Sequence, residues 1–249
     1  MNNPYRTPID SGSAEPVKKR VRVGWVFSVV CIVGLLFALL LPLSRNSRPA
    51  AQRMQCSNNL KQIALALHNY EAEYHSFPPA YTVDAEGRLL HSWRTLILPF
   101  LDEEPLYDSI DLSRPWDDPA NADAYETSPA VFHCPSSRAS PSFTTYLAIV
   151  ASNGCFHPPD GRRLSEITDS HSETLMVIEL ALEEAVHWMA PRDADAQSVL
   201  SFDQETRFAH SQGTNAVFTD GRVRFLSAEM SGADRRAMIS IAGNDTIAE

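Results

Sequence analysis

The N-terminal part of the chain carries the feature that most limits how it can fold, a basic cluster followed by a long uncharged segment. Lys18, Lys19, Arg20 and Arg22 come first, and residues 23–43 contain no charged side chain. A helix rises about 1.5 Å per residue, so a segment of this length spans about 30 Å, the hydrocarbon thickness of a bilayer. We therefore expect a transmembrane helix over residues 23–43.

Two kinds of cleavable leader also begin with basic residues and an apolar stretch. A secretory signal has a shorter apolar region of about 7–15 residues and a small-residue cleavage site after it. Here the apolar segment is followed by the sequence Ser-Arg-Asn, which offers no such site. A lipoprotein leader has a small residue directly before its cysteine, whereas Val30 precedes Cys31. The segment is therefore predicted to remain as an anchor, with the lipid bilayer as its partner.

The length and charge of the chain indicate the size of the remaining domain, its partners and its side of the membrane. Beyond the anchor about 200 residues remain, enough for one medium-sized domain. The formal net charge of -10 and the pI near 5.2 argue against a nucleic-acid partner. Residues 1–22 are predicted to be a disordered, basic-ended tail, and the balance of basic residues slightly favours a cytoplasmic N-terminus. We expect a single-pass protein of the inner membrane with its C-terminal domain on the extracytoplasmic side.

The segment after the anchor has the apolar period of a helix. Spaced by steps of three and four, six residues fall on one helix face: Cys56, Leu60, Ile63, Leu67, Tyr70 and Tyr74. The Phe-Pro-Pro sequence at 77–79 then ends the helix, because proline lacks an amide donor. One long helix is predicted from about Val23 to about His75, with residues 44–76 as its extramembrane half.

Residues 77–249 mix helical and strand patterns. A capped helix is predicted from Ser92, with an interruption at Pro99 and a second turn beyond it. Residues 144–151 and 173–180 are short β-rich apolar runs and are predicted as strands.

The last part of the chain contains the clearest hairpin pattern. Asp220-Gly221 lies between two alternating runs, a composition that favours a two-residue turn. A short C-terminal helix is predicted to end near Gly243. The predicted class is α+β, with the long N-terminal helix packed on a mostly antiparallel sheet in a domain over residues 77–249.

Four separated blocks, residues 53–81, 92–121, 132–137 and 210–221, resemble one bacterial family of prepilin-like proteins of unknown function, domain of unknown function family 1559. The family carries a C-terminal signature of His, nine residues and Asp-Gly, matched here by His210, Asp220 and Gly221. The resemblance implies a pilin-like or pseudopilin-like fold and an exported soluble domain. It implies no known reaction.

The chain departs from that family at its leader. Members usually have a leader that ends in Gly and is followed by Phe-Thr-Leu-Ile-Glu. Here Gly24, the degenerate cleavage position, is followed by Trp-Val-Phe-Ser-Val, so that Val29 stands where the glutamate is expected. Without that carboxylate, a new N-terminal amine held in hydrocarbon would be unpaired at a cost of several kcal/mol. We expect an anchor that is no longer used for assembly.

The four cysteines differ in their surroundings. Cys56 lies on the inward helix face and Cys134 follows an apolar pair, so a disulfide between them is permitted in an oxidising compartment. The alternative is two buried free thiols. Cys31 is predicted to be a small apolar residue of the membrane segment, and Cys155 has no assigned role.

His210 and Asp220 could form a catalytic or metal-binding pair. The preferred interpretation is structural, with His210 bonded within a loop and Asp220-Gly221 forming the hairpin turn. The eight histidines show no His-Glu-x-x-His motif and no paired Cys/His spacing, so neither a zinc site nor a cofactor is predicted. The acidic group in residues 117–123 lacks the pattern of a calcium loop and is predicted to be a solvated turn: Asp117, Asp118, Asn121 and Asp123.

These features predict a non-enzymatic, membrane-anchored pilin-like protein that displays a soluble domain, with other envelope or pilin-like proteins as further partners. One alternative is a membrane-tethered module that binds a ligand or envelope polymer, with Trp93, Trp116 and Trp188 along its groove. Core packing is the preferred interpretation of each tryptophan. The other alternative is a tethered hydrolase that uses His210 and Asp220.

Overall fold

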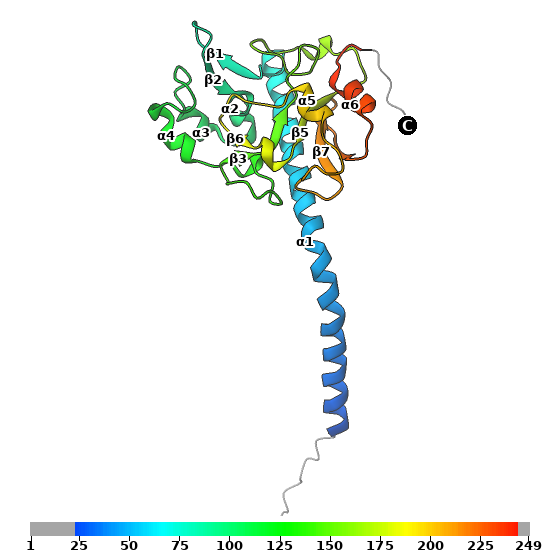
Figure 1. The fold of residues 1–249 in the computed structure, drawn as a ribbon. Coiled ribbons are helices and arrows are strands. Elements are labelled where there is room, and N and C mark those ends of the chain that lie inside the picture. The colour runs from blue at the N-terminus through cyan, green and yellow to red at the C-terminus, as the bar shows by residue number, and fades with distance from the viewer. Residues whose placement is uncertain (1–22, 244–249) are drawn as a thin grey trace, which may run out of the picture. The chain divides into compact units, whose positions relative to one another are not determined.

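The computed structural model describes residues 23–243, except the side chains of residue 23 and of residues 38–47 (Figure 1). The chain divides into two units between Asn46 and Ser47, and helix α1 (Val23–Tyr74) contributes to both. The tail predicted for residues 1–22 lies outside the described residues.

In the first unit α1 is apolar over much of its circumference. Its exposed large apolar side chains are Trp25, Val26, Phe27, Val29, Val30, Ile32, Val33, Leu35, Leu36 and Phe37. Within the part of the chain that the structure describes, no helix combines the length and the apolar character needed to cross a membrane. The span predicted over residues 23–43 includes residues 38–43, whose side chains lie outside the described set.

In the second unit α1 buries one face. The first four residues of the predicted stripe are fully buried: Cys56, Leu60, Ile63 and Leu67. Tyr70, the fifth, is partly buried. The prediction is wrong for Tyr74, which is 58% exposed. The helix ends at Tyr74, where the following residue, His75, has a φ of 59°. Tyr74 instead packs its ring against Tyr70, with 4.4 Å between the ring centroids.

The main sheet has four antiparallel strands in the order β4 (Tyr146–Ala148), β5 (Leu175–Glu179), β7 (Gly213–Phe218) and β8 (Val223–Ser227). Two smaller antiparallel sheets pair β1 (Tyr81–Val83) with β2 (Leu89–Ser92), and β3 (Phe143–Thr144) with β6 (Val186–His187). The α+β class with antiparallel sheets is confirmed.

The run predicted as one strand over residues 144–151 is divided between two sheets. Thr144 pairs with β6, whereas Tyr146 begins the pairing with β5. The second predicted strand, residues 173–180, matches β5. All of β5 is buried, which explains why its sequence is a continuous apolar run without alternation.

Short helices surround the sheets: α2 (Trp93–Leu96), α3 (Glu104–Asp108), α4 (Ala122–Glu126), α5 (Ala196–Leu200) and α6 (Gly232–Ile239). The cap predicted at Ser92 is confirmed, since its hydroxyl accepts a hydrogen bond from the Arg94 amide. A 3₁₀ turn (Leu98–Leu101) contains Pro99. Helix α6 ends at Ile239, before the predicted end near Gly243, because Ser240 has an extended backbone.

Two groups of buried side chains lie on opposite faces of the main sheet. On one face, Val177 and Val217 pack in the same cluster as the buried stripe of α1. On the other face, Ile178 and Phe218 cluster with residues of α5 and α6, which lie beside β7 (Figure 1). The second unit is therefore layered as helix, sheet and helices.

The predicted hairpin joins β7 to β8, but its turn is longer than predicted. The Phe218 amide donates a hydrogen bond to the Arg222 carbonyl and so closes the loop, which leaves residues 219–221 between them. The Gly221 amide donates to the Phe218 carbonyl, and Gly221 has a φ of 79°. This is the three-residue hairpin loop in which glycine occupies the left-handed position. Asp-Gly fits either turn, and the sequence therefore could not distinguish them.

His187 in β6 is a buried imidazole with a defined tautomer. Its Nδ1 accepts a hydrogen bond from the Met189 amide at 3.3 Å, and its Nε2 faces the Tyr125 carbonyl at 3.2 Å. The ring stacks on Tyr125 with centroids 4.2 Å apart. Burial lowers the pKa of His187 below 6.5, and Arg94 acts in the same direction, while the Tyr125 carbonyl and Glu126 oppose the shift.

We expect stability to depend on pH through His187. The unfolded chain takes up a proton near pH 6.5, before the folded chain does, so stability falls as pH drops through 6.5 toward the lowered pKa. Replacing His187 by phenylalanine keeps the stacking and should reduce the slope measured by denaturant unfolding across this range; burial also lowers the pKa of His68 and of His91, which maintain the rest of the slope. His75→Asn, at an exposed position where asparagine tolerates the backbone, is the control. An equal slope in the His187 variant would contradict the assignment.

Candidate functional site

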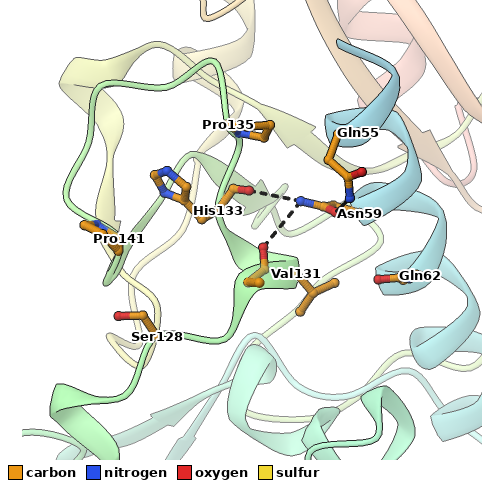
Figure 2. A pocket seen from close by; sticks show the side chains of 9 residues that line it. Gln55, Asn59, Gln62, Ser128, Val131, His133, Pro135 and Pro141 are labelled. Carbon is orange, nitrogen blue, oxygen red and sulfur yellow. Dashed lines mark hydrogen bonds between the residues drawn. The ribbon is translucent and has the colours of Figure 1, made fainter. Parts of the chain in front are cut away.

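The predicted disulfide is confirmed and joins α1 to a distant loop. Cys56 lies in α1, and Cys134 follows the 3₁₀ turn Ala130–Phe132, with 5.1 Å between their Cα atoms. One turn further along α1, the Asn59 amide donates to the carbonyls of Ala130 at 3.4 Å and His133 at 3.0 Å (Figure 2). Covalent and hydrogen bonds therefore fix the same loop on α1.

A pocket of about 420 Å³ opens between this loop and α1. Gln55 and Gln62 line it from the helix, while Ser128 and His133 line it from the facing chain (Figure 2). The Gln55 amide donates to the Asn59 side chain at 2.9 Å, which orients both amides at the wall of the pocket.

The family-motif residue His210 lies against the disulfide. Its Nε2 is 3.7 Å from Cys134 Sγ and 3.2 Å from Glu179 Oε2. Glu179 is the last residue of β5, and His210 precedes β7 and bridges to Gly213. The side chains of His210 and Glu179 are 5% and 1% exposed, so this contact is excluded from solvent.

Glu179 is held by its neighbours in β7 but is incompletely bonded. The Asn215 amide donates to Oε2 at 3.3 Å, and the Thr214 hydroxyl donates to the Glu179 carbonyl. Among the described residues, Oε1 has no hydrogen-bond partner. Burial, together with the Glu179 charge, raises the pKa of Tyr146 and keeps its phenol neutral. A buried carboxylate with a free oxygen is costly unless another group compensates it.

Four potential ligand atoms therefore meet in the core. One atom each from Cys56, Cys134, Glu179 and His210 lies within 4.8 Å of the others, and all four residues are buried. They come from α1, the loop after residue 132, β5 and the segment before β7. With the sulfurs bonded to each other, only the imidazole and the carboxylate have free donor atoms.

Asp220, the other polar residue of the family motif, has different partners. Its carboxylate accepts a hydrogen bond from the Arg222 amide and lies 3.4 Å from the Arg222 guanidinium. A Cβ added to the adjacent Gly221 would lie 3.4 Å from His68 of α1. Within residues 23–243, no hydrogen bond or ion pair joins Asp220 to His210. The two ends of the motif thus have separate positions, one beside the disulfide and one at the hairpin turn.

The other candidates from the sequence have structural contacts. Asp118 accepts a hydrogen bond from the Ala120 amide, and the buried Asn121 side chain binds the Asp111 and Pro115 carbonyls. Asp117 and Asp123 take no part in these hydrogen bonds, and both residues are exposed. These observations fit the preferred interpretation of a turn.

The tryptophans and the remaining buried cysteine also belong to the interior. Trp93 and Trp188 are 0% and 1% exposed, which confirms the preferred interpretation of core packing for these two tryptophans. Trp116 is partly exposed and stacks on Tyr125. Cys155 is a buried free thiol, and burial raises its pKa to about 12.

A buried ion pair that no sequence pattern indicated joins Arg94 to Asp193; the two groups are 2.7 Å apart, and their side chains are 0% and 1% exposed. Asp193 also accepts hydrogen bonds from the Trp93 indole and the Ala148 amide. Arg94 donates to four further carbonyls, those of Trp188, Tyr146, Ala190 and Arg192. Glu179 was not predicted from the sequence either. The only local signal for Glu179 was a charge at the end of a buried apolar strand.

The fold and the cluster define an α+β domain in which a helix is disulfide-bonded beside a buried imidazole and carboxylate. The model of one family, described as Protein of unknown function (DUF1559), matches residues 45–206, more than half of the chain. The chain belongs to this family, which confirms the family resemblance seen in the sequence; the match covers the first three blocks, and residues 210–221 lie beyond it. No curated protein and no solved structure gives a significant match.

Proposed function

We propose that this chain is a non-enzymatic, single-pass protein of the bacterial inner membrane that displays a pilin-like domain on the extracytoplasmic side. The observation that carries the proposal is the apolar helix surface over residues 24–37, directly after a basic cluster. A helix that is apolar over much of its circumference needs an apolar surrounding, and lipid supplies it.

Two features support the extracytoplasmic side. The Cys56–Cys134 disulfide fits an oxidising compartment, since cytoplasmic reductants keep most thiols reduced. The basic residues on the two sides of the segment slightly favour a cytoplasmic N-terminus. The arrangement of α1, with its second part against an antiparallel sheet, is consistent with a pilin-like or pseudopilin-like domain. Val29, five residues after Gly24 where the family has a glutamate, supports an anchor that does not assemble as pilins do.

The alternatives have weaker support. Two of the three tryptophans proposed for a binding groove are in the core. For a hydrolase, His210 would need an accessible nucleophile, but its nearest polar partners are a buried carboxylate and a disulfide. A display role, with the bilayer and other envelope or pilin-like proteins as partners, requires neither a tryptophan-lined groove nor an accessible nucleophile.

Membrane fractionation tests the anchor. We expect the full-length chain to stay in the membrane fraction after high-salt and carbonate washes. The double variant Val30→Arg/Val33→Arg should shift to the soluble fraction, because a charge at the bilayer centre costs about 2.5–3.5 kcal/mol on insertion. The matched control is Met54→Arg/Leu65→Arg, which changes two exposed apolar residues of α1 in the second unit.

The control should remain membrane-bound, and a reporter fused after Glu249 should be active only outside the cytoplasm. Release of the unmodified chain by high salt would refute the integral anchor. Cytoplasmic reporter activity would reverse the proposed orientation.

A further inference from the structure

We propose that the reduced form of the buried cluster binds one Zn²⁺ ion through Cys56, Cys134, Glu179 and His210. Two thiolates, one imidazole and one carboxylate are ligands that zinc takes in four-coordinate tetrahedral sites. The disulfide and the metal are then alternative states of the same two cysteines.

The distances already match a tetrahedral site at two of its edges. With Zn–N and Zn–O bonds of about 2.0 Å, the nitrogen and oxygen lie about 3.3 Å apart. His210 Nε2 and Glu179 Oε2 are separated by 3.2 Å. With a Zn–S bond of about 2.3 Å, nitrogen and sulfur lie about 3.6 Å apart, and His210 Nε2 is 3.7 Å from Cys134 Sγ. The separation that must grow is that between the two sulfurs, and breaking their bond allows this.

The surroundings of Glu179 indicate a cation. The carboxylate is 1% exposed, and its Oε1 has no hydrogen-bond partner among the described residues. A divalent ion beside it would offset the cost of burying the charge. The Asn215 amide already holds Oε2, in the way that outer hydrogen bonds orient metal ligands.

The two states interconvert by a balanced exchange. A dithiol supplies two electrons and two protons to the Cys56–Cys134 bond, and is itself oxidised to a cyclic disulfide. Zn²⁺ then replaces the two thiol protons, which pass to solvent. The nascent chain, which carries both thiols, can bind the ion without the first step.

The test uses the full-length protein in detergent micelles. One sample keeps its disulfide. The other is unfolded, reduced with a phosphine that becomes the phosphine oxide, and refolded with Zn²⁺. We expect one zinc per reduced chain and none per oxidised chain by native mass spectrometry, and a sulfur-to-cobalt charge-transfer band when Co²⁺ replaces Zn²⁺. A folded, reduced protein that binds no zinc, or equal binding by the oxidised protein, would overturn the proposal.

Three variants locate the ion while keeping Cys56 and Cys134. Glu179→Gln and His210→Ala should each weaken Zn²⁺ binding more than about tenfold, with circular dichroism showing that they fold. Cys155→Ala is the matched control and should bind as the unmodified chain does, since Cys155 is not in the cluster. Unchanged affinity in both the Glu179 and His210 variants would assign the zinc to the thiols alone and contradict the site.

Discussion

Replacing Arg94 by methionine is expected to destabilise the protein by about 3–5 kcal/mol, the usual cost of removing one partner from a buried ion pair. The guanidinium is fully buried, so its loss leaves the Asp193 carboxylate without its countercharge. It also removes the guanidinium donor from four main-chain carbonyls, of which that of Ala190 keeps the Arg192 amide as a donor. Denaturant unfolding followed by circular dichroism measures the change.

Two further variants separate charge from geometry. Arg94→Lys keeps the charge but has three donors in place of a planar set of five, so it should recover only part of the loss. Arg88→Met removes an exposed arginine from its pairing with Asp84 and should change stability little. If Arg94→Met unfolded at the same denaturant concentration as Arg88→Met, the Arg94 network would not be stabilising.

Loss of the Cys56–Cys134 bond is the second large effect. The bond closes a loop of 78 residues, for which the chain-entropy model gives about 4 kcal/mol. At about 2–4 °C per kcal/mol for a domain of this size, Cys56→Ser or Cys134→Ser should lower Tm by about 10 °C. Differential scanning calorimetry measures the shift, and non-reducing peptide mapping checks the linkage.

Each single variant should resemble the double variant, because all three lack the same bond. Cys31→Ser is the control and should retain the Tm of the unmodified protein, since Cys31 is outside the second unit. Two free thiols in protein from an oxidising compartment would leave packing and hydrogen bonds, among them those of Gln52 and Asn59, to hold the loop.

The features that the sequence predicted well depend on local patterns. The stripe from Cys56 to Leu67 follows the helical period, the cap at Ser92 follows residue type, and the hairpin follows from Asp-Gly between alternating runs. Cys56 and Cys134 could be paired because each also had a local sign of burial. Tyr74 was predicted wrongly because the helical period continues to the end of a helix, whereas the core it faces does not.

The candidate site depends on contacts between distant segments. His210 was identified through the family motif, but nothing near it in the sequence points to Glu179, 31 positions earlier on another strand. Arg94 and Asp193 are 99 positions apart, and each reads alone as an ordinary charged residue. Only the β5–β7 pairing and the loop after β6 bring these groups together, and no short-range pattern specifies such pairings.

The position of Cys56 along α1 decides how the domain responds to mechanical force. The second unit begins at Ser47, and the disulfide lies about two and a half turns further along the helix. Tension applied through the N-terminal part of α1 therefore reaches a covalent bond before it reaches Leu60, Ile63 and Leu67. The load passes to the loop at Cys134, so pulling cannot peel the helix from the sheet turn by turn. With the cysteines reduced and no ion bound, the same force would act only on side-chain packing and on the hydrogen bonds of Gln52 and Asn59 to the loop.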